Sequence, residues 1–227
     1  MNVIMLVSNF ARERKSFMFE RFFPDEWVES AYSIDYEGYF EAGYRGLIFD
    51  IDNTLVPHGA DADERAIELF DRLKKIGFDI CLLSNNKKPR VERFNKDVNV
   101  NYIFKAGKPY SKNYYVATMM TRTSVHSTLV IGDQLFTDIY GGKLAGIHTI
   151  LVNPIDKKED FGVRLKRFLE RPVMKFYKHS LKEKVSEMPK NRKPESKASR
   201  MRRRKEKHFS VAERIARIDR LFNSRYI

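Results

Sequence analysis

The chain has 227 residues, enough for one full α/β domain with appendages but too few for two large domains. Its one cysteine excludes an intramolecular disulfide and predicts a reducing, cytoplasmic location. The net charge is +13, and the excess is confined to one part of the chain. Residues 1–156 hold 19 Lys and Arg against 21 Asp and Glu, whereas residues 157–227 hold 24 against 9. The sequence therefore predicts a nearly neutral body followed by a strongly basic tail.

The N-terminal segment, residues 1–45, is expected to pack on the core that follows it. Its early apolar run, Val3 to Val7, is too short for a secretory signal. No stretch approaches the roughly 20 apolar residues of a membrane-spanning helix, so we expect a soluble protein, at most peripheral to a membrane. The stretch from Phe22 to Trp27 is predicted as a loop leading into a short helix, with Trp27 packed on the domain.

Short apolar runs alternate with amphipathic stretches between residues 46 and 155. The apolar runs predict five strands, at 46–51, 78–83, 102–104, 128–132 and 148–152. The amphipathic stretches predict four helices, at 61–76, 88–95, 111–121 and 138–145. Continuously apolar strands separated by helices are typical of a parallel sheet covered on both faces. The expected fold class is therefore α/β, with a doubly wound, mainly parallel, five-stranded Rossmann-like sheet. Cys81, inside one apolar run, is interpreted as a core residue.

The basic tail is predicted to contain three segments. Residues 156–185 form a basic amphipathic segment that Pro172 is expected to interrupt. Residues 186–208 form a disordered basic linker, and residues 209–227 form an amphipathic helix that begins with a capping box at Ser210. Three interpretations of the tail stay open: a solvated extension, a surface that binds anionic lipid headgroups, and a segment that binds nucleic acid. We expect the chemistry to be independent of the tail.

Polar residues end four of the predicted strands or follow them immediately. They stand in the segments Asp50–Thr54, Ser84–Asn86, Lys108–Pro109 and Gly132–Asp138. Because ligands bind beyond the carboxyl ends of parallel strands, these segments should meet at one edge of the sheet. Several carboxylates crowded there would repel one another and lose hydration, a conflict that a divalent cation resolves. The pattern predicts a Mg²⁺ site, because carboxylate oxygens are ligands that Mg²⁺ prefers.

These motifs resemble the haloacid-dehalogenase (HAD) superfamily of phosphatases that use an aspartate nucleophile. Phe-Asp-Ile-Asp-Asn-Thr-Leu-Val, Ser-Asn-Asn, Phe-Lys-Ala-Gly-Lys-Pro and Ile-Gly-Asp-Gln-Leu-Phe-Thr-Asp are similar to its YqeG-type branch, as is the lead-in Phe-Phe-Pro-Asp-Glu. The resemblance covers about residues 20–155 and implies a HAD-like phosphatase core at 46–155. In eukaryotic relatives of this branch, the implied activity is dephosphorylation of phosphatidylglycerophosphate, a membrane lipid precursor.

The resemblance also implies roles for individual residues. Asp50 is expected to be the nucleophile, and Asp52 the general acid and base. Asp50, Asp133 and the backbone carbonyl of Asp52 are expected to bind Mg²⁺. The phosphate is expected to be bound by Ser84, Asn85 and Lys108, with Ser84 and Lys108 also acting in catalysis. The expected supporting residues, which orient these groups, are Thr54 and Asp138.

The spacing of the motifs leaves no room for a cap domain. Residues 55–83 and 85–107 must each already supply a helix and a strand. The expected site is therefore open, which suits a phosphate monoester with bulk beyond the phosphate, such as phosphatidylglycerophosphate at a membrane surface. Two alternatives remain: a nucleic-acid- or ribosome-associated factor on the same fold, and a phosphatase of a small soluble metabolite.

Overall fold

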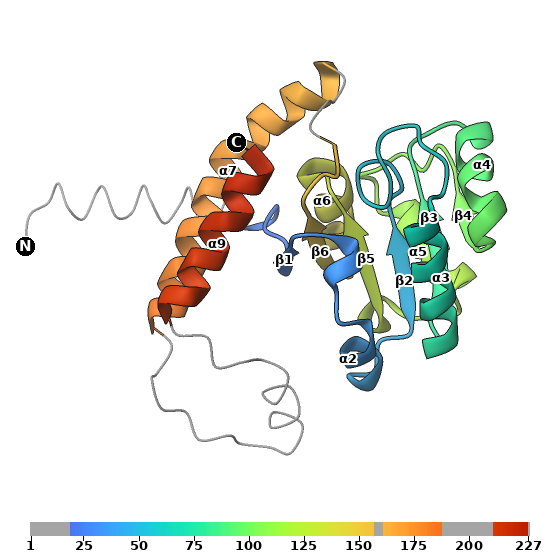
Figure 1. Cartoon of the computed structure of the whole chain (residues 1–227), viewed down its shortest axis with the longest axis horizontal. Coiled ribbons are helices and arrows are strands. Elements are labelled where there is room, and N and C mark those ends of the chain that lie inside the picture. Colours follow the sequence, from blue (N-terminus) through green and yellow to red (C-terminus); the bar gives the residue numbers. More distant parts are fainter. Residues whose placement is uncertain (1–18, 157–160, 188–210, 227) are drawn as a thin grey trace, which may run out of the picture.

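A six-stranded parallel sheet forms the centre of the molecule (Figure 1). The structure, a computed structural model, describes residues 19–156, 161–187 and 211–226. The strands are β1 (Glu26–Val28), β2 (Gly46–Phe49), β3 (Asp79–Leu83), β4 (Asn101–Ile103), β5 (Thr128–Gly132) and β6 (His148–Val152). Their spatial order is β1-β6-β5-β2-β3-β4. From β2 the chain continues to β3 and β4 on one side and then crosses to β5 and β6 on the other. The sheet is therefore doubly wound and has a topological switch point beside β2.

The predicted parallel α/β fold is confirmed, but the predicted number of strands is wrong. The additional strand is β1, which contains Trp27 where a loop and short helix were expected. Asp25 explains this placement, because its Oδ2 accepts hydrogen bonds from the backbone N and Oγ1 of Thr149, each at 2.9 Å. These bonds align the segment with β6, and the three residues of β1 were too few to give a periodic signal in the sequence. Trp27 is buried, as expected, and its Nε1 donates to Asn153 Oδ1.

Helices cover both faces of the sheet, and the four predicted between the strands are present. The helices described before residue 157 are η1 (Ala31–Ser33), α2 (Tyr36–Glu41), α3 (Glu64–Ile76), α4 (Lys88–Val98), α5 (Lys112–Met120), η2 (Val125–Ser127), η3 (Leu135–Ile139) and α6 (Tyr140–Leu144). Asp63 caps the start of α3 by accepting from Ala66 N, and Gly77 ends it in a left-handed conformation. The helix expected at 138–145 is α6, which is shorter than expected because a π-helical turn, η3, precedes it.

Alternate strand residues face two separate apolar layers, as the continuous apolar runs predicted. On one face, Leu47 and Phe49 of β2 pack with Phe70 of α3 and Phe94 of α4. On the other face, strand residues pack against α5 and the end of α6, and Cys81 is buried among them. This burial raises the pKa of the Cys81 thiol to about 12, which keeps it protonated and agrees with its interpretation as a core residue.

The C-terminal part of the chain forms an antiparallel helical hairpin of α7 (Phe161–Glu187) and α9 (Val211–Tyr226), drawn in orange and red in Figure 1. Trp27, Leu151, Met174 and Phe222 belong to the apolar cluster that joins the hairpin to the β1 side of the sheet. Nowhere in the described ranges does a helix combine the length and apolar character needed to cross a bilayer.

The expectation that Pro172 interrupts its helix is wrong, because α7 continues through it. Pro172 cannot donate a hydrogen bond to the carbonyl of Phe168. Both residues are exposed, so water can satisfy the free carbonyl while Val173 and Met174 stay buried on the inner side. The linker predicted to be disordered lies almost entirely outside the described residues, as do residues 1–18.

Candidate active site

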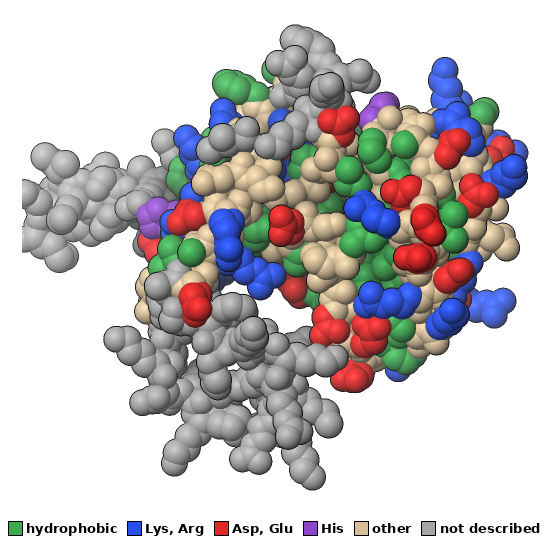
Figure 2. All heavy atoms as spheres, in the orientation of Figure 1, with side chains coloured by type: hydrophobic (Ala, Val, Ile, Leu, Met, Phe, Trp, Pro, Cys, Tyr) green, Lys and Arg blue, Asp and Glu red, His purple; other side chains and the backbone are tan. Residues whose placement is uncertain are grey.

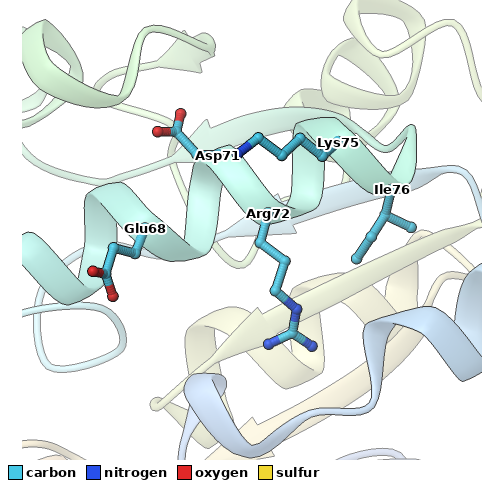
Figure 3. Close-up of a pocket in the computed structure, with 5 residues that line it drawn as sticks. All are labelled: Glu68, Asp71, Arg72, Lys75 and Ile76. Carbon is cyan, nitrogen blue, oxygen red and sulfur yellow. The ribbon is translucent and has the colours of Figure 1, made fainter.

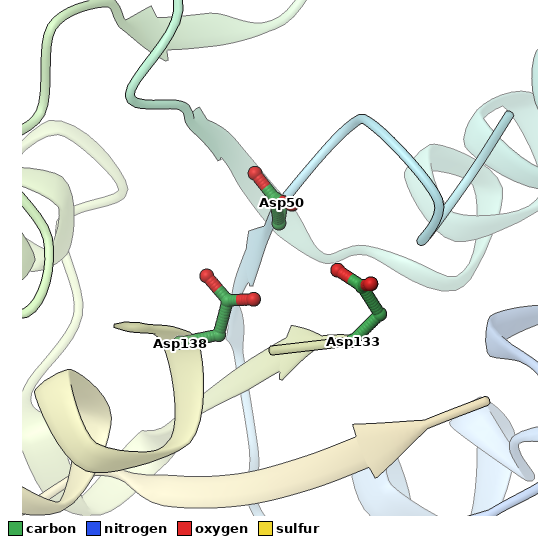
Figure 4. A group of neighbouring side chains, drawn as sticks. All are labelled: Asp50, Asp133 and Asp138. Carbon is green, nitrogen blue, oxygen red and sulfur yellow. The ribbon is translucent and has the colours of Figure 1, made fainter. Parts of the chain in front are cut away.

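Three buried carboxylates, from Asp50, Asp133 and Asp138, point toward a common space at the carboxyl edge of the sheet (Figure 4). Asp50 directly follows β2, Asp133 directly follows the neighbouring β5, and Asp138 lies in η3. Oxygen atoms of the three groups lie within 4.8 Å of one another. The cluster therefore occupies the switch point of the sheet, where the topology brings ligands to the strand ends.

The ammonium group of Lys108 joins two of these carboxylates. Its Nζ lies 2.7 Å from Asp50 Oδ1 and 2.6 Å from Asp138 Oδ1. Burial lowers the pKa of Lys108, but Asp138 and Asp50 outweigh burial and raise it, so the lysine stays charged. Burial raises the pKa of Asp50 to about 8, against the opposing effect of Lys108. A charged lysine that touches both carboxylates is suited to neutralise an anion bound beside them.

Two neighbours hold this lysine in position. The side chain of Asn85 accepts from Lys108 N at 2.8 Å and donates to Lys108 O at 3.2 Å, so it orients the loop rather than presenting a free amide. Asp138 Oδ2 accepts from Gln134 N at 3.0 Å while its Oδ1 contacts the lysine. A Cβ atom at Gly132 would collide with the Asp138 side chain, which explains the glycine before Asp133.

The carboxylate of Asp133 is completely buried and faces the cluster from β5. Burial raises its pKa to about 6, and the guanidinium of Arg167 opposes this rise. Thr54 Oγ1 lies 3.4 Å from Asp133 Oδ1, a weak contact. Three hard oxygen donors this close, with one lysine between two of them, fit a divalent cation such as Mg²⁺.

The side chain of Asp52 contacts a different set of groups. Asn86 Nδ2 donates to its Oδ2 at 2.5 Å, while Arg90 Nη2 and the backbone N of Gly59 donate to its Oδ1 at 2.9 and 2.7 Å. Asp52 is therefore buried and only two residues from Asp50 in sequence, but its carboxylate is not one of the three in the cluster. Ser84 is also buried at the end of β3, and its Oγ accepts from Asn86 N at 3.2 Å.

Comparisons with known proteins identify the family of this chain. A family model described as HAD-hydrolase-like matches residues 105–157. Over 159 residues, the chain is 38% identical to "Probable phosphatase YqeG" from Bacillus subtilis (strain 168), covering 69% of this chain and 92% of that protein. The chain belongs to the YqeG-type branch of the HAD-like hydrolases. The resemblance inferred from its motifs is confirmed, and its enzyme class is HAD-type phosphatase.

Two further similarities are more distant. This HAD-like hydrolase is 27% identical over 164 residues to "Phosphatidylglycerophosphate phosphatase 1, chloroplastic/mitochondrial" from Arabidopsis thaliana. That match covers 67% of this chain but only 47% of the plant protein, so the chain spans about half the length of that relative. A crystal structure of a protein from Listeria monocytogenes serotype 4b aligns with a TM-score of 0.42 and 17% identity, covering 52% of this chain and 84% of that chain.

Two arginines of the C-terminal hairpin contact the YqeG-type core. The sequence did not predict these contacts. Arg167 of α7 donates from Nη2 to Asp133 Oδ2 and from Nη1 to Asp133 O, the latter at 2.6 Å. Arg225 of α9 donates to the same backbone oxygen from Nη2 at 2.6 Å. Both belong to a tail rich in basic residues, so nothing in the sequence distinguished them from solvated charges.

The other site residues that were not predicted are Asn86, Arg90 and Glu170. Asn86 lies within the Ser-Asn-Asn motif, and Arg90 lies in the first turn of the helix that follows it, so their positions gave a weak signal. Glu170 gave none, although its neighbour Arg167 stands three residues earlier on one helix. In the HAD-like hydrolase all three orient groups around the strand ends.

A shallow pocket elsewhere on the HAD-like hydrolase does not contribute to this site. It has a volume of about 470 Å³, and α3 alone provides its lining (Figure 3). The lining residues are Glu68, Asp71, Arg72, Lys75 and Ile76. Figure 2 shows acidic and basic side chains intermingled over the surface of the sheet domain, as is typical of a solvated face. The chemistry is therefore assigned to the strand ends and not to this pocket.

Proposed function

We propose that this chain is a Mg²⁺-dependent phosphomonoester hydrolase that forms an aspartyl-phosphate on Asp50. The observation that carries the proposal is the buried carboxylate of Asp50, 2.7 Å from Lys108 Nζ and beside Asp133 and Asp138. Asp50, Asp133 and the backbone carbonyl of Asp52 would hold Mg²⁺, which supplies positive charge that polarises the phosphoryl oxygens. Membership in the HAD-type phosphatases implies a phosphate monoester as substrate.

The chemistry then runs in two displacement steps. A carboxylate oxygen of Asp50 attacks phosphorus, the bond from phosphorus to the leaving oxygen breaks, and Asp52 gives that oxygen a proton. Asp52 next takes a proton from a water molecule that attacks the aspartyl-phosphate, which releases Asp50 and inorganic phosphate. Lys108 and Ser84 bind the phosphoryl oxygens. Asn85 and Asp138 position Lys108, and Thr54 contacts Asp133.

The proposed substrate class is a lipid phosphate monoester at an anionic surface, with phosphatidylglycerophosphate as the first candidate. The name of the plant relative and the absence of room for a cap support it. On α7, the apolar side chains within two residues of Arg167 are exposed: 51% for Leu165, 67% for Phe168 and 53% for Leu169. Their spacing places them on one side of the helix. Farther along α7, a hollow of about 570 Å³ has Lys175, Lys178 and Lys182 in its lining. An apolar stripe with basic side chains nearby is suited to an anionic lipid surface.

Release of inorganic phosphate from a substrate panel tests the activity. The panel compares phosphatidylglycerophosphate in phosphatidylglycerol vesicles with soluble sugar phosphates and nucleotides, each with Mg²⁺ and with excess EDTA. We expect Mg²⁺-dependent hydrolysis with preference for the lipid. Full activity in EDTA contradicts the metal assignment, and preference for a soluble phosphate supports the metabolite alternative.

Replacing Phe168 tests the membrane surface separately from the chemistry. Phe168→Ser should weaken binding to phosphatidylglycerol vesicles about tenfold, because burying a phenylalanine side chain contributes about 1.5–3 kcal/mol. Hydrolysis of a soluble phosphate should be unchanged. The matched control is Met119→Ser, which replaces an apolar side chain that is 76% exposed on α5.

Cosedimentation with vesicles measures this binding. Equal binding by the parent chain and Phe168→Ser contradicts the assigned surface. Tight, salt-sensitive RNA binding by the parent chain, with no vesicle binding, supports the nucleic-acid alternative instead.

A further inference from the structure

We propose that Arg167 is a positioning residue for the metal ligand Asp133, which makes the C-terminal hairpin part of the active site. The inference rests on the proposed function, because it takes Asp133 to be a ligand of Mg²⁺. Nothing in the motifs of residues 46–155 requires a contribution from α7 or α9, so this role adds new residues to the reaction.

Arg167 contacts both the side chain and the backbone of Asp133. Its two terminal nitrogens donate to Asp133 Oδ2 and to Asp133 O. A rigid guanidinium fork that binds two atoms of one residue fixes the side-chain torsion as well as the position of the chain. One carboxylate oxygen, Oδ2, is engaged by Arg167, whereas Oδ1 lies toward Thr54. The arrangement leaves Oδ1 available to a cation.

A second layer of charges holds the Arg167 guanidinium. Glu170, 1% exposed, lies with its Oε2 3.4 Å from Arg167 Nη1 and accepts from Arg225 Nη2 at 2.8 Å. Its Oε1 accepts from Leu135 N at 2.9 Å, which ties the network to η3. Arg225 also donates to Val152 O at 2.9 Å, so the network reaches the end of β6. Three charged side chains, Arg167, Glu170 and Arg225, thus join α7 and α9 to the ends of β5 and β6.

Stability alone gives a poor account of this network. Burying ionised groups costs several kcal/mol each, and a well-packed apolar contact often stabilises a fold at least as well. The adjoining hairpin contact already uses apolar residues, including Trp27, Met174 and Phe222. The charges are concentrated where the hairpin meets Asp133. Partners that orient a metal ligand in this way typically change metal affinity 10- to 100-fold when they are replaced.

Binding of Mn²⁺ to the full chain provides a test that does not depend on turnover. The electron paramagnetic resonance signal of free Mn²⁺ measures how much ion is bound. We expect Arg167→Met to raise the Mn²⁺ concentration at half-saturation about tenfold. Arg167→Lys, which keeps the charge without the fork, should give an intermediate value. The matched control is Arg171→Met, one turn farther along α7, because Arg171 is exposed and contacts Tyr226 O instead of Asp133.

Asp133→Asn separates failure of this inference from failure of the proposed function. If Asp133→Asn binds Mn²⁺ as tightly as the parent chain, the metal site itself is wrong. The positioning role is overturned by a different result. In that result, Asp133→Asn loses Mn²⁺ binding, but folded Arg167→Met and Arg167→Lys bind Mn²⁺ at least as tightly as the parent chain. Should the Arg167 variants fail to fold, Glu170→Gln removes the charge behind the guanidinium and is expected to weaken Mn²⁺ binding about threefold; unchanged binding by folded Glu170→Gln then overturns the role.

Discussion

Two groups of charged residues meet at Asp133, and they reach it by different routes. Asp50, Lys108 and Asp138 come from strand ends and the loops that follow them, so parallel topology brings them together. Arg167 and Arg225 come from a helical hairpin that packs beside the sheet. The first group was visible in the order of the motifs, whereas the second depends on how the hairpin packs. A motif therefore locates the reacting groups, but not every group that orients them.

Contrary to the expectation from the sequence, the tail should not be dispensable for chemistry, because Arg225 lies in it and contacts Asp133. A chain truncated after residue 171 would keep Arg167 and Glu170 but lose Arg225. Glu170 would then keep Arg167 and Leu135 N as partners but lose its closest contact with a guanidinium. Such a chain is expected to lose stability and to hold Asp133 less firmly.

The largest expected effect isolates the strand-end group. Asp50→Asn should lower turnover about a thousandfold or more, because the amide cannot act as the nucleophile. The fold should be retained, since Lys108 keeps its contact with Asp138. Steady-state phosphate release and circular dichroism check the two statements. Turnover close to that of the parent chain would remove Asp50 from the proposed mechanism.

A smaller effect isolates the hairpin group. Arg225→Met should lower the free energy of unfolding by about 3 kcal/mol, because it removes one partner of a buried ion pair with Glu170. Urea denaturation measures the change, and Arg220→Met on the exposed side of α9 is the control, expected to stay within about 0.5 kcal/mol. A loss below about 1 kcal/mol for Arg225→Met would mean that the network contributes little to holding the hairpin.

The smallest expected effect is a pH dependence that links the two groups. Because the metal-free pKa values of Asp50 and Asp133 are raised to about 8 and about 6, protons compete with a cation for these carboxylates. Mn²⁺ binding should weaken about tenfold or more between pH 8 and pH 6. Titrations with Mn²⁺ at the two pH values check the sign. Stronger binding at pH 6 would contradict it.

The raised pKa of Asp50 also predicts how the stability of the metal-free protein depends on pH. When a carboxyl group has a higher pKa in the folded than in the unfolded state, the folded protein loses stability as the pH rises from the unfolded-state pKa to the folded-state pKa. In EDTA, the parent chain should therefore become less stable relative to Asp50→Asn as the pH increases from about 4 to about 8. Thermal denaturation of both proteins across this range measures the difference, which would stay constant if Asp50 did not titrate there.

Local sequence patterns were enough to predict those features that depend only on the order of strands in a parallel sheet. Continuously apolar runs such as 46–51 and 128–132 required a sheet buried on both faces, and parallel order then placed Asp50 and Asp133 at one edge. β1 escaped prediction because three residues show no period and because Asp25 and Thr149, which align it, are distant in sequence. The continuation of α7 through Pro172 also depended on tertiary packing, since only the exposed side of the helix loses a hydrogen bond.

The sheet joins its first strand to its last, and this has a kinetic consequence. The bonds between Asp25 and Thr149 span 124 residues, so closing that loop carries a large entropy cost before the contact stabilises anything. Strands β2 and β5 lie closer in sequence and form the middle of the sheet. We expect β1 to join late in folding and to open early, so that its amide hydrogens exchange with solvent before those of β2. The hairpin packs on this late strand through the contact of Trp27 with Tyr177. We therefore expect the active site to be completed only at the end of folding.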